Sequence, residues 1–273
     1  MYSQIFSTEE DPRTQELRSR LDSFYAETSD YTAFHESNWQ PVYWQPIAER
    51  AVNLLQSKGD CRILEFGAGR TGFGKYLQEY LQKADIAADL SDRLTFDTQD
   101  VTPQNQDYLA TQASQVYIGD LLEVTQKYDL IFSTFVWEHL TTPKAILDHL
   151  ISLLNPQGSI FLISPRYDLP FYLSPSCRHL SKGDRLKLSL WLSLKRLLTL
   201  LGQKPSFLIH LDPVLFHQKW FRDADAIHWV SLWDLLSYLP SNMQITKHKI
   251  EAGGLKGKIW ADYCVMFVQI QQK

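Results

Sequence analysis

Short apolar runs alternate with segments of helical periodicity through the middle of the chain. The run 62–66 combines three apolar residues with one carboxylate, and apolar side chains at helical spacing follow it over 73–80. Further apolar runs predict strands at 85–90, 116–118, 128–132 and 159–164. Because strands alternate with helical segments, the pattern predicts an α/β fold whose parallel strands are joined by right-handed crossovers.

The two ends of the chain carry different patterns. Leu17, Leu21 and Phe24 lie on one face of a helix predicted at 14–28. After the fifth strand, the segment 166–222 is too long for a simple loop, and a leucine-rich helix is predicted inside it at 184–201. We also predict helices at 47–56, 148–155 and 231–239, a connecting helix or loop at 93–115, and two antiparallel strands at 243–250 and 259–269 around a loop at 253–257.

Composition places the chain among globular proteins. At 273 residues, with 44% hydrophobic and 13% aromatic residues, it can bury a good core as a single domain. The net charge of −4 argues against a general nucleic-acid binder. The charge is uneven, because 166–222 holds ten Lys and Arg against three Asp and Glu, a net of +7. This basic segment therefore contrasts with the remainder of the chain, which carries −11.

Three further features indicate the cellular compartment of the protein and whether it binds a metal. Three widely spaced cysteines suggest a reducing compartment without a disulfide framework. The N-terminus is polar and acidic, with no apolar signal-peptide region. The most apolar run, 186–201, is interrupted by Lys187, Lys195 and Arg196, so it is a poor candidate for a membrane-spanning helix. We therefore expect a cytoplasmic protein, and no metal site, because the histidines lack zinc-type spacing.

A glycine turn follows the first predicted strand. Residues 67–69 join that strand to a helix, an arrangement that places a nucleotide against a helix N-terminus. With Gly72, the turn formally fits the dinucleotide fingerprint, and Asp89 is then the later acidic residue. Glu65 lies two residues before the first glycine and argues against this interpretation, because its carboxylate would repel a pyrophosphate.

The stretch 61–77 resembles motif I of the class I S-adenosylmethionine (SAM) dependent methyltransferases, a hydrophobic strand that ends in an acidic residue before G-x-G. Residues 119–120 and 133–140 resemble two later segments of the same family. The resemblance implies a Rossmann-like three-layer sandwich with SAM as cofactor. Its sheet would have seven mostly parallel strands and a C-terminal antiparallel hairpin, with an N-terminal helical lid and a helical insertion after strand five. The implied cofactor contacts are Glu65, Gly67, Ala68, Gly69, Asp89, Leu90, Asp120, Leu121, Ser133 and Thr134.

The resemblance also implies individual roles. Glu65 would help to position the methionine part of SAM, Asp89 would accept hydrogen bonds from the ribose hydroxyls, and Asp120 would meet the adenine amino group. Each acidic residue has a plainer interpretation as well. Asp89 or Asp92 could cap a helix, and glycine-aspartate at 119–120 is a common turn.

Transfer to a hydroxyl benefits from a general base, and two histidines are candidates. His139 follows the fourth strand, at the sheet edge where ligands bind in open α/β folds, and His228 precedes the last predicted helix. Both could equally serve local structure, His139 at a helix N-terminus and His228 near a cap. Arg166, Tyr43 and Asp225 are the candidate acceptor-binding residues, with Arg166 suited to an anionic group.

The sequence thus predicts a SAM-dependent methyltransferase for a small-molecule or saccharide-type acceptor, with oxygen as the methylated atom. The alternatives are a non-catalytic scaffold with the same fold and an NAD(P)-dependent oxidoreductase. The sequence also leaves open whether the helix at 184–201 packs on protein or rests on an anionic membrane. We expect one domain over 1–273, divided into a lid (1–46), a SAM-binding core (47–165), a basic insertion (166–222) and a closing helix and strand pair (223–273).

Overall fold

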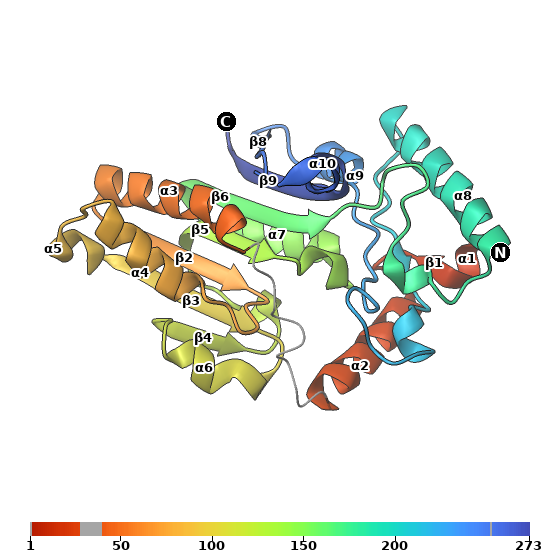
Figure 1. Ribbon diagram of the computed structural model, residues 1–273, viewed down its shortest axis with the longest axis horizontal. Helices are drawn as coiled ribbons and strands as arrows, with labels where there is room; N and C mark the ends of the chain where they lie inside the picture. Colours follow the sequence, from red (N-terminus) through yellow and green to blue (C-terminus); the bar gives the residue numbers. More distant parts are fainter. Residues whose placement is uncertain (1, 28–39, 252) are drawn as a thin grey trace.

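The structure is a computed structural model that describes residues 2–27, 40–251 and 253–273. Its centre is a seven-stranded sheet in the order β4-β3-β2-β5-β6-β9-β8 (Figure 1). Strands β2 to β6 run parallel, and β9 pairs antiparallel with both β6 and β8. This order confirms the expected Rossmann-like sheet with its C-terminal antiparallel pair. The strands are β2 (Cys61–Phe66), β3 (Leu94–Asp100), β4 (Gln115–Ile118), β5 (Tyr128–Thr134), β6 (Leu154–Pro165), β8 (Met243–Lys247) and β9 (Val265–Gln272).

Helices cover both faces of the sheet, because successive side chains of a strand point to opposite faces. Ile63 of β2 belongs to the core shared with α3 and α4, whereas the next residue, Leu64, belongs to the core shared with α7 and α9. The result is the three-layer sandwich that the sequence predicts. The helices are α3 (Gln40–Lys58), α4 (Phe73–Lys83), α5 (Ala88–Ser91), α6 (Gln106–Ala110), α7 (Pro143–Leu153), α9 (Leu232–Tyr238) and α10 (Gly254–Ile259).

One predicted strand is wrong. Residues 85–90 enter the short helix α5, and the true second strand, β3, lies inside the segment expected to be a helix or loop. The apolar pattern fails there because β3 buries polar side chains. Asp97 is fully buried yet bonded to Arg62 and Tyr128, and Gln99 is bonded to backbone groups on two neighbouring loops.

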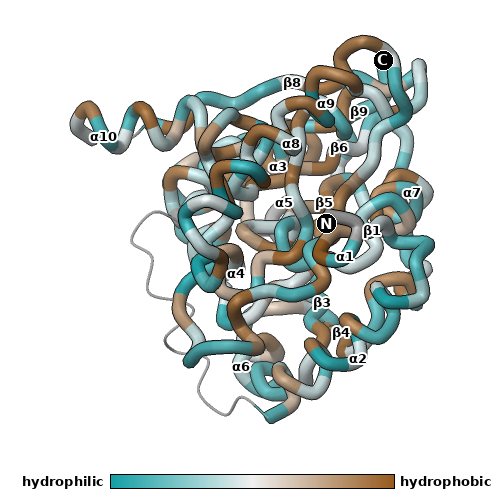
Figure 2. The backbone as a smooth tube through the Cα atoms, turned by 90° about the vertical axis from the view of Figure 1, so that its right-hand side faces the viewer, coloured by the Kyte–Doolittle hydropathy of each residue, from teal (hydrophilic) through white to brown (hydrophobic). Residues whose placement is uncertain are grey.

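Two element boundaries also differ from expectation. Helix α3 begins at Gln40 and contains Pro46, which the sequence suggests as a break. Burial of Tyr43, Trp44 and Ile47 on the core face stabilises the helix despite that proline. At the other end, α10 and the π-helix η7 (Trp260–Cys264) replace the predicted loop and the start of the last strand. Figure 2 shows α10 projecting from the body of the molecule.

The N-terminus and the basic insertion form one subdomain, here called the cap. It contains α1 (Tyr2–Ile5), β1 (Phe6–Ser7), α2 (Pro12–Glu27), α8 (Lys182–Leu200) and β7 (Ile209–His210). Strand β1 pairs antiparallel with β7, and Leu17 and Leu21 of α2 pack with Ile209, Val214 and Ile227 (Figure 1). The lid aromatics expected at Tyr31, Phe34, His35 and Trp39 lie outside the described residues.

Short helical turns complete the architecture. Several of them carry side chains that matter below, since they lie at strand ends or in the cap. They are η2 (Pro103–Asn105), η3 (Leu121–Glu123), η4 (Trp137–His139), η5 (Pro175–Cys177) and η6 (Val214–Phe216). Within the described part of the chain, no helix has both the length and the apolar character needed to cross a membrane.

Candidate active site

A cavity of about 600 Å³ lies at the carboxyl ends of the parallel strands. The loops after β2, β3, β4 and β5 form one side of it, and α2 and the loop 220–225 form the other. Ligands of open α/β sheets bind at this edge, and the volume suits a drug-sized molecule. Its wall includes the predicted residues Glu65, Gly67, Ala68, Gly69, Asp120, Leu121, Thr134, His139 and Asp225.

The glycine turn requires glycine for two reasons. Gly67 and Gly69 have φ values of 64° and 54°, in the left-handed region that side chains disfavour. A Cβ on Gly67 would also lie 2.6 Å from the side chain of Val136. The turn is held from the neighbouring strand, because Gly69 N donates to Asp100 Oδ2 at 2.6 Å and Ala68 N donates to Gln99 O at 3.0 Å.

Glu65 is a buried carboxyl group at the floor of the cavity. It is 3% exposed, and its Oε2 has no hydrogen-bond partner among the described residues. Burial raises the pKa of Glu65 to about 8, against a lowering by Thr71 and with a further increase from Asp100. An unpaired buried carboxyl of this kind favours a cationic ligand, which would restore its ordinary ionisation.

Asp100 takes the strand-end position that the sequence assigned to Asp89. It ends β3, lines the cavity, and accepts hydrogen bonds from Gly69 N and Thr102 N. Burial raises the pKa of Asp100. Asp89 and Leu90 lie instead in α5, and Leu90 is absent from the described cavity wall. Sequence reasoning missed Asp100 because the polar strand before it was not recognised.

An ion pair joins the cap to the opposite wall. Arg18 Nη2 of α2 donates to Asp120 Oδ2 at 2.6 Å, while Asp120 Oδ1 accepts from Leu122 N at 3.0 Å. Both side chains are partly exposed, at 38% and 28%. Helix α2 of the cap therefore contacts the residue expected near the adenine.

His139 lies in η4, directly after β5, with three carboxylates around it. Its Nδ1 is 3.1 Å from the carbonyl oxygen and 3.4 Å from Oδ2 of Asp225, and its Nε2 is 3.9 Å from Oε1 of Glu138. Burial opposes the charged imidazolium. The negative charges of Asp225, Glu138 and Asp223 outweigh that effect and raise the pKa of His139 to about 9.

Asp225 is itself held in place. Its side chain is buried, and it accepts hydrogen bonds from Tyr25 Oη at 2.7 Å and Trp220 Nε1 at 3.4 Å. These partners come from α2 and from the loop 220–225. Tyr25 lies 200 positions from Asp225 in the sequence, so local patterns could not predict this contact, and Trp220 was not predicted either.

Four other predicted site residues are absent from the described cavity wall. His228 is buried, its Nδ1 is 2.9 Å from Trp137 O, and burial lowers its pKa to about 3. Tyr43 is fully buried edge-on against Phe135, and Ser133 is fully buried within β5. Arg166 binds both oxygens of Asp168, at 2.6 and 2.9 Å, which leaves its charge compensated. These positions fit structural roles.

The comparisons with known proteins identify the family. A family model described as "Methyltransferase domain" matches residues 38–207, more than half of the chain. The chain belongs to this methyltransferase family. It is a class I enzyme that uses SAM, as the sequence predicts from the glycine turn and its acidic neighbour. Membership removes the NAD(P)-dependent alternative. No curated protein sequence matched the chain significantly.

Solved structures with a similar course of the chain are also methyltransferases. The plantazolicin methyltransferase BpumL, with a desmethylplantazolicin analogue and S-adenosylhomocysteine (SAH), is 11% identical, with a TM-score of 0.48, covering 97% of this chain and 92% of that one. The N-methyltransferase NodS from Bradyrhizobium japonicum WM9 is 13% identical, with a TM-score of 0.44 and coverages of 96% and 99%. Magnesium protoporphyrin IX methyltransferase from Synechocystis PCC 6803 is 11% identical, with a TM-score of 0.46 and coverages of 94% and 95%.

Proposed function

We propose that this methyltransferase methylates a hydroxyl oxygen of a neutral small molecule, with a saccharide-type acceptor as the leading class. The observation that supports the proposal is the position of His139. It lies in the same cavity as the glycine turn and is oriented by Asp225, as a general base must be.

The cofactor would occupy the strand-end side of the cavity. Glu65 would pair with the ammonium group of SAM. This pairing would give the buried carboxyl the partner that it lacks among the described residues. Asp100 would accept hydrogen bonds from the ribose hydroxyls in place of Asp89, and Asp120 and Leu121 would lie by the adenine. SAM supplies an electrophilic methyl group, so the protein's task is to align the acceptor, an effect that can be worth roughly 7–11 kcal/mol.

His139 would act on the acceptor hydroxyl in its neutral form. Its Nε2 would take the hydroxyl proton, and the carboxylate of Asp225 would stabilise the imidazolium that results. Because three carboxylates hold the pKa of His139 at about 9, the neutral form gains population as pH rises toward that value. General-base catalysis of this kind typically contributes about 10²–10⁴-fold in rate.

The charge of the cavity favours a neutral acceptor over an anionic one. The described wall residues include six acidic side chains, against two arginines, Arg18 and Arg222, and His139. Arg166, the residue predicted to hold an anion, is paired with Asp168 outside the wall. Aromatic rings of Tyr25 and Trp220 beside the carboxylate of Asp225 would suit the apolar face and hydroxyls of a sugar.

The test is SAH formation with a panel of sugars, phenols and amines as acceptors. For the best acceptor, kcat/KM should rise with pH through about 9 and level off above that value, and His139→Gln should lower it by about 10²–10⁴-fold. His248→Gln, on the sheet edge outside the cavity wall, should match the wild type. Preference for amines, or an unchanged rate in His139→Gln, would refute the proposal. SAH binding without turnover of any acceptor would favour the scaffold alternative.

We further propose that α8 rests on an anionic membrane surface. Its buried face, which includes Leu188 and Leu192, packs on the core, and leucines at about 50% exposure or more lie on the opposite face. Lys182, Arg185 and Lys187 near its start supply charge that would attract acidic lipids. The exposed leucines are Leu186, Leu190, Leu194, Leu197, Leu200 and Leu201.

Sedimentation with vesicles tests this contact. Binding should require phosphatidylserine in the vesicles and should fall in a Leu190→Ser, Leu197→Ser double variant. Leu255→Ser, at a still more exposed leucine on α10, is the control. Equal sedimentation of the double variant and the control would reject α8 as the contact.

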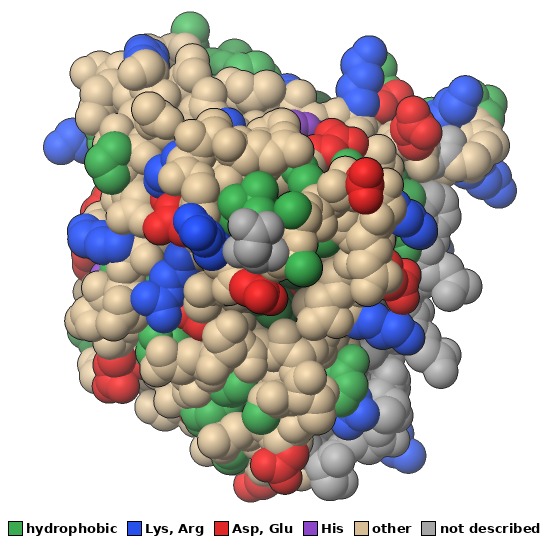
Figure 3. Space-filling view, turned by 90° about the vertical axis from the view of Figure 1, so that its left-hand side faces the viewer, with side chains coloured by type: hydrophobic (Ala, Val, Ile, Leu, Met, Phe, Trp, Pro, Cys, Tyr) green, Lys and Arg blue, Asp and Glu red, His purple; other side chains and the backbone are tan. Residues whose placement is uncertain are grey.

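The remaining assignments are proposals as well. The three cysteines are free, which suits a cytoplasmic location. Figure 3 shows acidic and basic side chains interspersed on one face, which offers a nucleic acid no continuous positive surface. We keep one domain over 1–273, with the boundary between lid and core moved from 46 to the start of α3 at Gln40.

A further inference from the structure

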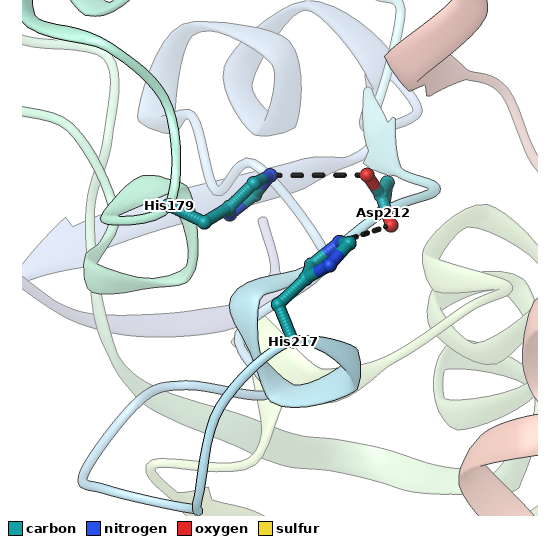
Figure 4. A group of neighbouring side chains, drawn as sticks. All are labelled: His179, Asp212 and His217. Carbon is teal, nitrogen blue, oxygen red and sulfur yellow. Dashed lines mark hydrogen bonds and ion pairs between the residues drawn. The ribbon is translucent and has the colours of Figure 1, made fainter.

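Two histidines and one aspartate converge in the cap, away from the cavity. His179 follows η5, Asp212 follows β7, and His217 ends η6. His217 Nε2 lies 2.8 Å from Asp212 Oδ1, and His179 Nε2 lies 3.8 Å from Asp212 Oδ2. The imidazole rings stack with centroids 4.6 Å apart, and both face the carboxylate (Figure 4).

His179 is the unusual member of this group. Neither of its ring nitrogens has a hydrogen-bond partner among the described residues, although both atoms are buried. Leaving a buried polar atom unpaired costs free energy, so such an atom indicates a missing partner. The partner must be compatible with a carboxylate and a second imidazole, which points to a cation.

We propose that His179, Asp212 and His217 bind a divalent transition-metal ion, with Zn²⁺ as the ion to test. One ligand atom from each residue lies within 4.8 Å of the other two. Small side-chain rotations would therefore bring each of these atoms to about 2.0–2.2 Å from an ion bound between them. Two imidazoles and one carboxylate are a recurrent set for Zn²⁺ and Fe²⁺.

The surroundings support ready access by a metal. Asp212 and His217 side chains are 42% and 44% exposed, while His179 is 14% exposed and forms the inner wall. Burial, with a smaller effect from His217, lowers the pKa of His179.

The site would connect the segment before α8 to the segment that leads into the cavity loop 220–225. His179 lies directly before α8, and His217 lies three residues before Trp220, which begins the loop that holds Asp225. None of the three proposed ligands lines the cavity. A bound ion would therefore fix the position of the acceptor wall, with no direct role in methyl transfer.

The test is titration of the full chain, freed of its affinity tag and of metals, with ZnCl₂ in a calorimeter. We expect one ion per chain, with affinity lowered at least 100-fold in His179→Gln and in Asp212→Asn. His149→Gln, a histidine bonded to Val124 O on another surface, should bind Zn²⁺ as the wild type does. Binding that is absent, or unaffected by both ligand variants, would overturn the site.

Two further measurements separate loss of a ligand from loss of the fold. Each variant should keep the far-ultraviolet circular dichroism of the wild type, and Co²⁺ added in place of Zn²⁺ should give visible absorption bands that only the wild type and His149→Gln show. Zn²⁺ should also raise the melting temperature of those two proteins alone. These readouts need no acceptor, so they stand apart from the proposed methyl transfer.

Discussion

At the scale of single residues, the ionisation of Glu65 differs strongly between the folded and the unfolded chain. Its pKa is raised to about 8 by burial, whereas in the unfolded chain it has the ordinary value of 4.5. A carboxyl with a raised folded-state pKa stabilises the fold at low pH, and that contribution is lost as pH rises from 4.5 through 8.

Replacement by glutamine should remove this pH dependence. Glu65→Gln should gain stability relative to the wild type as pH rises from about 5 to about 8.5, at roughly 1.4 kcal/mol for each unit of pKa shift. The same variant should bind SAM at least about 10-fold more weakly, since a hydrogen bond to a charged group is worth about 1.5–3 kcal/mol. Urea unfolding at the two pH values and calorimetric titration with SAM measure both effects. A pH-independent stability difference would contradict the assignment.

The two candidate ribose ligands can be separated directly. Asp100→Ala should weaken SAH binding by about 10-fold or more, because Asp100 lines the cavity and also holds Gly69 N. Asp89→Ala should bind SAH within about twofold of the wild type, because Asp89 lies in α5 and does not end a strand of the sheet. Equal losses in both variants would restore the role that the sequence assigned to Asp89.

At the scale of elements, the cap depends on packing between the N-terminus and the insertion. Leu17 of α2 is 2% exposed and belongs to the same core as Ile209 and Val214. Leu17→Ala should cost about 2–5 kcal/mol of stability, because it leaves a cavity in that core. Thermal unfolding measures the loss, with the exposed Ser23→Ala as control. A loss below about 1 kcal/mol would mean that α2 does not depend on this core.

Sequence patterns predicted the elements whose apolar residues are buried, and missed those stabilised by polar contacts. The runs at 62–66, 128–132 and 159–164 all lie in strands of the sheet. Strand β3 was missed because Asp97 and Gln99 are buried and satisfied by partners distant in sequence. Local periodicity carries no information about such partners.

The same limit applies to the site. The glycine turn and Glu65 are contiguous, so their motif is visible in one stretch of sequence. His139 was found because it follows a strand, but its orientation by Asp225 depends on how the insertion returns to the sheet. Arg166 is paired with Asp168, two residues away, so its role as an anion site stays a prediction.

At the scale of the whole molecule, the cavity lies between the sheet and the cap, and Arg18 joins the two sides. Its ion pair with Asp120 is partly exposed, so it is worth about 0–1 kcal/mol and is weakened by salt. SAH should dissociate from the wild type up to about fivefold faster at high salt than at low salt. From the Arg18→Gln variant, SAH should dissociate at the faster rate at every salt concentration. Stopped-flow displacement of SAH measures the rate. A wild-type rate independent of salt would show that this contact does not restrain the product.

The Arg18–Asp120 pair has a consequence for the rate of catalytic turnover. A helix from the first 27 residues touches the residue beside the expected adenine position, more than 100 positions along the chain. If dissociation of SAH limits turnover, the Arg18–Asp120 contact determines how long the product stays bound. His139 then determines the rate of the methyl-transfer step. Ionic conditions would then regulate the number of catalytic cycles per second and leave the choice of acceptor unchanged.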